Sequence, residues 1–273
     1  MGILHDNLLR LGVHGTRLLG RYVGEQLPLY YVCEYQKSGG TWLGQMIADA
    51  LQIPFPQHPR LPVAHAAVIH NHWGYDPRLR RVFYLVRDGR DVLVSLWFHR
   101  MREIAAAREA GERHGHAAAY DRLFGRGYDP ADARTHLGAF LEHELAHPRG
   151  TRMSWGQHVE AWAFDRPHVV RVRYEDLLAD TAGELQRIIP IHSGRPLDPI
   201  QARATAEKFT FARQTGRKAG QEDRASFRRK GVAGDWVNHF SRATAERFEA
   251  CFGDTLRRLG YDAAPGWATR LPP

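Results

Sequence analysis

The residues whose types and spacing most clearly suggest chemistry lie in CEYQKSGGTWLGQM, residues 33–46. An apolar run, YYVCEY (30–35), leads into a glycine-bearing turn, and a helical pattern follows. Such a turn presents the free N–H groups of a helix N-terminus to an anion. Lys37 stands before Gly39 and Gly40, whereas the loop of nucleoside triphosphatases ends in Gly-Lys-Ser/Thr, whose hydroxyl binds Mg²⁺. The pattern therefore favours a ligand with one phosphate at this loop and no metal.

A second segment, RRVFYLVRDGRDVLVSLWFHR (80–100), also suits a phosphate. Arg87 closes a predicted strand, and Ser95 lies about two turns into the helix that follows. An arginine forks two hydrogen bonds to a phosphate, and a serine hydroxyl can donate a third. Asp91 near the helix start complements the helix dipole. The alternative is a plain strand–turn–helix with a surface arginine.

Two histidines form a third group of candidates. In VIHNHW (68–73), His70 and His72 are two residues apart near the end of a predicted strand, so both side chains project from the same face. A positioned histidine is the commonest general base, and it contributes roughly 10²–10⁴-fold to a rate. A His-x-His zinc pair is the competing interpretation, although the sequence shows no clear third ligand.

The elements that must position these residues alternate between strands and helices. Short, nearly continuous apolar strands separated by helices are typical of a parallel sheet that is covered on both faces. The expected strands are residues 30–35, 65–72, 81–87 and 168–174. The expected helices are residues 41–52, 91–105, 132–147, 154–164 and 181–189. The sequence thus predicts an α/β, three-layer, P-loop-like fold.

We expect residues 1–273 to form a single domain. Residues 100–153 are rich in His and Arg and helical by periodicity, which indicates a helical insertion in the α/β core. Residues 212–234 are charged, contain glycines and have few apolar side chains, which predicts a mobile loop. A final helix is expected over 242–259.

Composition narrows the class of protein. The chain has 43% hydrophobic and 25% charged residues, values of a globular protein, and a net charge of +8 that favours an anionic partner. The basic residues are scattered without a recognition-helix pattern, so we expect a small polyanion and no nucleic acid. Cys33 and Cys251 are far apart and are interpreted as reduced thiols, which favours a cytoplasmic location.

The N-terminal residues 1–20 are interrupted by charged side chains and lack the apolar stretch of a secretory signal. We expect no transmembrane span, because no apolar run approaches the roughly 18 residues that one requires. A helix that docks on the domain is the favoured interpretation. A peripheral membrane contact by this helix is the alternative.

Three motifs in order resemble the sulfotransferase family that uses PAPS, 3′-phosphoadenosine 5′-phosphosulfate. The family loop Pro-Lys-Ser-Gly-Thr-Thr-Trp is matched by Gln-Lys-Ser-Gly-Gly-Thr-Trp at 36–42. The motif Tyr-x-x-Arg-(three residues)-Asp-Val-x-Val-Ser resembles residues 84–95. Phe-x-Arg-Lys-Gly-x-x-Gly-Asp-Trp is matched at 227–236, and SWGQHVEAW (154–162) and VVRVRYEDL (169–177) also resemble the family.

The resemblance implies a PAPS-dependent sulfotransferase that releases PAP and requires no metal. Lys37 would contact the bridging oxygen of the 5′-phosphosulfate, which the loop cradles. Aligning HNH with the family's Lys-Thr-His triplet makes His72 the base and puts His70 where the lysine sits; His70 is the alternative base. The implied cofactor-binding residues are Lys37, Ser38, Gly39, Gly40, Thr41, Trp42, Arg87, Ser95, Tyr174, Phe211, Arg229, Lys230 and Gly231.

The sequence departs from the family at several positions. Gln36 replaces proline and Gly40 replaces threonine in the loop, and Phe209 replaces a small polar residue near Phe211. The expected acceptor is a small-molecule alcohol or phenol, or a saccharide, with an amine less favoured. The acceptor pocket is expected to draw on 54–66, the insertion 100–153 and the loop 212–234. The oligomeric state stays open. A P-loop nucleotide kinase and a non-catalytic nucleotide-binding protein are the rival functions.

Overall fold

The computed structural model divides the chain into two compact units. Unit 1 comprises Met1–Arg87 and His158–Gly216, and unit 2 comprises Asp88–Gln157 and Arg217–Pro273. The structure describes residues 3–56, 66–148, 151–261 and 263–271. Residues 57–65, which form most of the segment 54–66 where part of the acceptor pocket was expected, lie outside the described residues.

Unit 1 is built on a parallel sheet with the strand order β2-β1-β3-β4. Every residue of β1 and β3 is buried, so both faces of the sheet centre are covered, as the continuous apolar runs predict. The expected fold class, a central parallel sheet flanked by helices, is confirmed. The strands are β1 (Leu29–Glu34), β2 (Ala67–Asn71), β3 (Val82–Val86) and β4 (Val169–Arg173).

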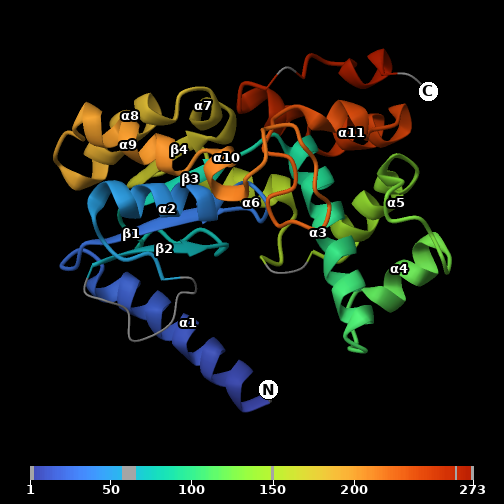
Figure 1. Ribbon diagram of the computed structural model, residues 1–273, viewed down its shortest axis with the longest axis horizontal. Helices are drawn as coiled ribbons and strands as arrows, with labels where there is room; N and C mark the ends of the chain where they lie inside the picture. The colour runs from blue at the N-terminus through green and yellow to red at the C-terminus, as the bar shows by residue number, and fades with distance from the viewer. Residues whose placement is uncertain (1–2, 57–65, 149–150, 262, 272–273) are drawn as a thin grey trace. The chain divides into compact units, whose positions relative to one another are not determined.

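Helices cover one face of this sheet and bury alternate strand residues such as Val32 and Phe83. Figure 1 shows α2, α8 and α9 on this side of the sheet. Leu43 of α2 and Ile188 of α8 belong to the same buried cluster. The helices of this layer are α2 (Gly40–Leu51), α7 (Tyr174–Ala179), α8 (Thr181–Ser193), α9 (Pro199–Lys208) and α10 (Phe211–Thr215).

The opposite face carries the residues that alternate with these. Tyr84 stacks on Trp162, with ring centroids 5.8 Å apart. Helix α1 (Ile3–Val23) lies on this side (Figure 1). A Cβ on Gly20 would lie 2.2 Å from the Tyr31 hydroxyl, so this helix approaches β1 closely.

The second half of α1 is attached to unit 1 by its basic side chains. Arg21 forms an ion pair with the buried Asp76, and the Arg17 guanidinium lies 5.5 Å from the centre of the Trp73 ring. These contacts favour the docking interpretation of the N-terminal helix. Among the described residues, no helix is both long and apolar enough to cross a membrane.

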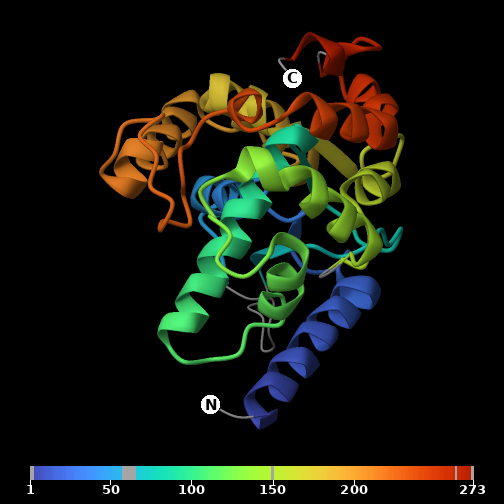
Figure 2. The same ribbon diagram turned by 90° about the vertical axis from the view of Figure 1, so that its right-hand side faces the viewer.

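Unit 2 is helical, and its core surrounds Trp97. This side chain is fully buried, contacts the Phe140 and Phe124 rings, and donates its indole N–H to the carbonyl of Pro130 at 3.0 Å. Figure 2 gives a second view of α3, α4 and α5. The elements are α3 (Gly89–Glu109), α4 (Ala117–Phe124), α5 (Ala133–Ala146), η1 (Asp235–Asn238), α11 (Arg242–Arg258) and η2 (Trp267–Arg270). Helix α6 (Trp155–Trp162) contains the chain boundary between the units.

The structure places the expected helical insertion, residues 100–153, within unit 2 and gives part of the expected loop a regular form. Residues 88–99, which directly precede the insertion, belong to the same unit as the insertion. In the segment expected to be mobile, the first residues are helical in α10, and the rest is tied by backbone bonds from Gly220 to Lys230 and from Asp223 to Arg229. The single-domain organisation and the mobility of this segment stay predictions.

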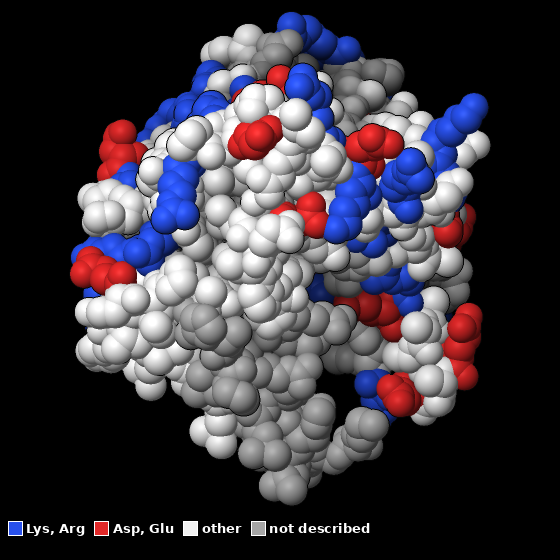
Figure 3. Space-filling model, turned by 60° about the vertical axis from the view of Figure 1, so that its left-hand side comes forward, with Lys and Arg blue, Asp and Glu red and all other residues white. Residues whose placement is uncertain are grey.

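Two expectations from composition can be compared with the structure. Cys33 and Cys251 are both free thiols, and burial raises the pKa of Cys33 to about 12. Lys and Arg side chains are dispersed on the face shown in Figure 3, with Asp and Glu between them. This dispersion agrees with the scattered basic residues of the sequence.

Candidate functional site

The loop after β1 has the geometry of an anion-binding turn. Lys37 and Gly39 adopt positive φ angles, 72° and 109°, and α2 begins at Gly40. The Ser38 hydroxyl and N–H both donate to the carbonyl of Tyr35, at 2.8 and 3.2 Å, which closes the turn. A Cβ on Gly39 would lie 3.0 Å from the Tyr174 ring, so the glycine is required both for its φ and for this close approach.

A carboxylate that sequence reasoning missed lies at the centre of this site. Glu34, the last residue of β1, is only 3% exposed. Its side chain accepts the backbone N–H of Gly40 and lies 3.0 Å from Nε2 of His70. Its backbone carbonyl lies 3.1 Å from Nδ1 of His72. A single glutamate therefore contacts the loop helix and both candidate histidines.

The two histidines differ in exposure and in the nitrogen that each engages. The His70 side chain is 16% exposed and faces the Glu34 carboxylate, whereas the His72 side chain is 41% exposed. Because the carbonyl oxygen of Glu34 can only accept a hydrogen bond, Nδ1 of His72 carries the proton and donates it, and Nε2 carries the lone pair of the neutral ring. This nitrogen is the one suited to accept a proton.

The electrostatics of the cluster keep Glu34 ionised and His72 neutral. Burial on its own raises the pKa of Glu34, but the hydrogen bond from His70, the proximity of both histidines and the hydrogen bond from the Gly40 N–H bring it below its ordinary value. Burial is the main cause that lowers the pKa of His72, and the charge of Lys37 adds to it. A neutral His72 at pH 7 is the form that a general base requires.

The same three side chains are a candidate set of metal ligands. One ligand atom each from Glu34, His70 and His72 lie within 4.8 Å of one another. Glu34 thus supplies the third ligand that the sequence did not reveal. In unit 2, His116, His143 and Glu144 form a second such set, in which Glu144 accepts the Tyr120 hydroxyl at 3.0 Å.

Arg87 and the aromatic residues expected around adenine are partly brought together in unit 1. The Arg87 guanidinium lies 4.4 Å from the centre of the Tyr174 ring and donates to the carbonyl of Lys37 at 3.3 Å. Trp42 meets the edge of Tyr174 at 5.8 Å and donates its indole N–H to the carbonyl of Phe209 at 2.8 Å. Phe211 begins α10 and is half-buried. The structure therefore adds the backbone of Phe209 to this group.

The expected residues of unit 2 lie on α3 and on the segment before η1. Ser95 is half-buried in the second turn of α3. Asp91, which the sequence suggested for the helix dipole, is buried and accepts the N–H groups of Gly234 and Trp236 at 2.7 and 2.9 Å. Arg90 lies 4.1 Å from the centre of the Trp236 ring. The start of α3 thus fixes the turn at 234–236.

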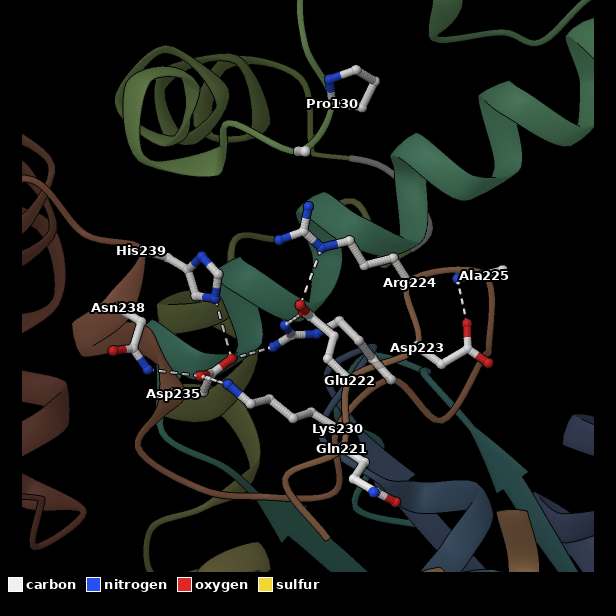
Figure 4. A network of polar contacts seen from close by, with 12 residues as sticks. Pro130, Gln221, Glu222, Asp223, Arg224, Ala225, Lys230, Asp235, Asn238 and His239 are labelled. Atoms are coloured by element: carbon white, nitrogen blue, oxygen red, sulfur yellow. Dashed lines mark hydrogen bonds and ion pairs between the residues drawn. The ribbon is translucent and has the colours of Figure 1, made fainter. Parts of the chain in front are cut away.

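Arg229 and Lys230 are held by a second carboxylate that the sequence did not single out. Asp235, whose side chain is 3% exposed, contacts Arg229 at 2.6 Å. It also contacts Lys230 at 2.5 Å (Figure 4). Asn238 and His239 contact the same carboxylate at 3.0 and 3.2 Å. These bonds lower the pKa of Asp235 far below its ordinary value, although burial alone would raise it. Gly231, next in the chain, has a φ of 66°.

These features define a P-loop-like α/β protein with an anion-binding turn, a strand-end histidine pair and a separate group of fixed cations. The chain belongs to the sulfotransferase family, because the family model described as "Sulfotransferase domain" matches residues 57–260. The human Sulfotransferase 2B1 is 24% identical over 268 residues, which cover 84% of this chain and 66% of the relative. The human Sulfotransferase 1C2 is 24% identical over 248 residues, which cover 81% and 80%. The chain thus spans just under two thirds of the first relative's length.

Solved structures agree on the fold. The mouse sulfotransferase SULT7A1 complexed with PAP has a TM-score of 0.58 and 21% identity, and the similarity covers 84% of each chain. Retinol dehydratase in complex with androsterone and inactive cofactor PAP has a TM-score of 0.56 and 17% identity, with 96% of each chain covered. The family resemblance and fold class predicted from the motifs are therefore confirmed.

Proposed function

We propose that this chain transfers a sulfuryl group from PAPS to a hydroxyl group of a small acceptor molecule. Membership of the sulfotransferase family supports this, as does the PAP in two structural neighbours. The observation that carries the proposal is the position of His72 beside the anion-binding turn. Its Nδ1 is engaged by the carbonyl of Glu34, and its Nε2 is left to take a proton.

The loop residues fit a phosphosulfate group. Lys37 supplies a positive charge, Thr41 a hydroxyl, and the glycines allow the backbone to approach the anion. Gly40 is the exception, since its N–H is engaged by Glu34. In unit 1, Arg87 binds phosphate, and Trp42, Tyr174 and Phe211 pack around adenine.

The proposed residues of unit 2 are Ser95, Arg229, Lys230 and Gly231. They resemble the part of the family motifs that binds the 3′-phosphate. The Asp235 contacts support this role, because they hold two long cationic side chains in defined positions before a ligand arrives. Preorganisation of this kind reduces the side-chain entropy that binding would otherwise cost.

In the proposed reaction, Nε2 of His72 accepts the proton of the acceptor hydroxyl as the acceptor oxygen bonds to sulfur. Lys37 stabilises the negative charge that develops on the bridging oxygen while the sulfur–oxygen bond to the 5′-phosphate breaks. The proton ends on His72, and PAP carries the released electron pair. Positioning and charge stabilisation dominate an in-line transfer of this type.

A binding assay and a transfer assay test the proposal. Calorimetry without magnesium should show PAP binding more tightly than ATP, and ³⁵S-labelled PAPS should label one member of a panel containing 4-nitrophenol, androsterone, retinol and a monosaccharide. Tighter binding of Mg²⁺-ATP with phosphate transfer would indicate the nucleotide kinase. PAP binding without transfer to any acceptor or to water would indicate a non-catalytic nucleotide-binding protein.

A further inference from the structure

The strongest unexplained feature of unit 1 is the buried carboxylate of Glu34 inside an anion-binding loop. A negative charge at this place opposes the binding of another anion. The carboxylate also engages the Gly40 N–H, which an incoming phosphosulfate would otherwise receive. A residue that weakens cofactor binding in this way requires a compensating role. The remaining contacts of Glu34 indicate that role.

Glu34 explains two departures from the family pattern at once. An ideal Cβ at Gly40 would lie 2.6 Å from the Glu34 carboxyl carbon and 2.6 Å from Nε2 of His70. The threonine that the family has at this position therefore has no room here. The glycine in the loop and the histidine at the lysine position are thus linked through one side chain, and the three residues form a single packed unit.

The hydrogen bonds of Glu34 decide the proton positions of both histidines. An ionised carboxylate only accepts hydrogen bonds, so Nε2 of His70 carries the proton at their 3.0 Å contact. In the neutral ring, Nδ1 of His70 then has the lone pair. The backbone carbonyl of Glu34 fixes the opposite arrangement in His72, with the proton on Nδ1.

We infer that Glu34 is a positioning residue for sulfuryl transfer, which fixes the ring and tautomer of His70 and ties it to the first turn of α2. This inference rests on the proposed function. Glu34 fixes the orientation of His70 but weakens cofactor binding, because it engages the Gly40 N–H and places a negative charge beside the loop. The expected signature is therefore opposite effects on binding and on turnover when the charge is removed.

Glu34→Gln is the informative variant, because it keeps the shape and removes the charge. Its amide oxygen must still accept the Gly40 N–H, so its NH₂ group faces His70. The His70 proton then moves from Nε2 to Nδ1, which ¹⁵N NMR of the imidazole nitrogens reports without any turnover. We expect PAP to bind more tightly to Glu34→Gln than to the wild type, by up to about tenfold. Single-turnover transfer from ³⁵S-PAPS, to the best acceptor of the panel, should fall about 10–100-fold, as for other residues that orient a functional histidine.

Two further variants separate positioning from a general loss of stability. Glu184→Gln removes another buried glutamate of unit 1, which pairs with Arg187 on α8, and should leave turnover unchanged. His70→Asn removes the other partner of the contact. If Glu34 acts through His70, the double variant Glu34→Gln/His70→Asn should be no slower than the slower single variant.

The outcomes distinguish this inference from the proposed function. If the wild type neither binds PAP nor uses PAPS, the proposed function fails, whereas the tautomer measurement still tests the Glu34–His70 contact. The inference would be overturned if Glu34→Gln kept the wild-type turnover and the wild-type tautomer of His70. It would also be overturned if the losses of transfer rate in the two single variants added up in the double variant. Loss of wild-type activity in EDTA with recovery in Zn²⁺ would also overturn it and assign Glu34, His70 and His72 to a metal site.

Discussion

The guanidinium group of Arg87 lies on the face of the Tyr174 ring, with its carbon 4.4 Å from the ring centre. Arg87 also donates to the carbonyl of Lys37, so its side chain connects the anion-binding turn with the residues that begin α7. Contact with an aromatic face restricts the orientation of an arginine without neutralising its charge. Such an arginine is well prepared to meet a phosphate.

We predict that Arg87→Ala weakens PAP binding by about 1.5–3 kcal/mol, the usual contribution of a charge-assisted hydrogen bond. The binding of adenosine 5′-phosphosulfate, which lacks the 3′-phosphate, should be weakened much less by the same substitution. Ser95→Ala should show the same preference with a smaller loss. Calorimetry with both nucleotides measures the difference, and Arg171→Ala on the exposed face of β4 is the matched control. Equal losses of binding free energy for the two nucleotides would show that Arg87 does not bind the 3′-phosphate.

Asp235→Asn should destabilise the protein by about 1.5–3 kcal/mol at pH 7, because two cations lose their ionised acceptor. The pKa of Asp235 is lowered in the folded protein, so its stabilisation is complete above the ordinary aspartate value of about 4 and declines as the pH falls below it. The difference between wild type and variant should therefore shrink in urea unfolding below pH 4.

The control for Asp235 is another aspartate of unit 2 with an arginine partner. Asp254 pairs with Arg257 on α11, but its side chain is 91% exposed. Exposed ion pairs contribute little, so Asp254→Asn should change the free energy of unfolding by less than about 1 kcal/mol. Similar losses of unfolding free energy in the two variants would show that the contacts of Asp235 stabilise the protein no more than an exposed ion pair does.

The sequence predicted the main strands and helices because their apolar residues lie next to one another in the chain. It also placed Lys37 and His72 correctly at two neighbouring strand ends, since parallel strands end at the same edge of a sheet. Glu34 could not be recognised in this way. A single acidic residue at a strand end resembles an ordinary solvent-exposed terminus, and its burial depends on partners 6 and 36 positions away.

Asp235 shows the same limit in unit 2. Its sequence neighbours suggested a phosphate motif, but the motif does not say that the aspartate neutralises Arg229 and Lys230. The role of Asp91 depends on Gly234 and Trp236, more than 140 positions further along the chain. The composition of the segment 212–234 likewise did not reveal the backbone hydrogen bonds that connect its two halves, because they join residues 6 and 10 positions apart.

A third prediction concerns acid stability and His158. Its Nδ1 lies 2.8 Å from the Tyr84 hydroxyl and its Nε2 lies 3.1 Å from the carbonyl of Trp73, and burial lowers its pKa to about 4. The unfolded chain, with an ordinary value of about 6.5, therefore binds the extra proton first. The free energy of unfolding should fall as the pH drops from about 6.5 to 4, by at most about 1.4 kcal/mol per pH unit from this group.

The contribution of His158 is isolated by comparing the wild type with His158→Asn at several pH values. The variant should be less stable at pH 7, and the difference should narrow by up to about 3 kcal/mol at pH 4. The pKa values of His72 and His192 are also lowered by burial, but both remain in the variant and cancel in the comparison. A constant difference across this range would show that His158 is not kept neutral by folding.

A fourth prediction concerns the segment 212–234. If Arg229 and Lys230 bind the 3′-phosphate, ligand binding should hold this segment more firmly than Asp235 does alone. Limited trypsin digestion should cut within it in the free protein, and saturating PAP should slow cleavage by about tenfold or more, since protection follows the population of the open form. Adenosine is the control, because it lacks the phosphates. Cleavage at the same rate with and without PAP would contradict a role in binding.

The last prediction assigns the base. His72→Ala should leave PAP affinity nearly unchanged, because the proposed partner of its ring is the acceptor and not the nucleotide, while single-turnover transfer falls roughly 10²–10⁴-fold. The wild-type rate should be level near pH 7 and should decline only below about pH 6.5, since the pKa of His72 is lowered and the base is lost on protonation. Lys37→Ala should reduce both rate and nucleotide affinity, and His70→Ala should reduce the rate less than His72→Ala. If His72→Ala instead retains near-wild-type turnover and His70→Ala abolishes it, then His70, with its Nδ1 lone pair, is the base and His72 only lines the acceptor side.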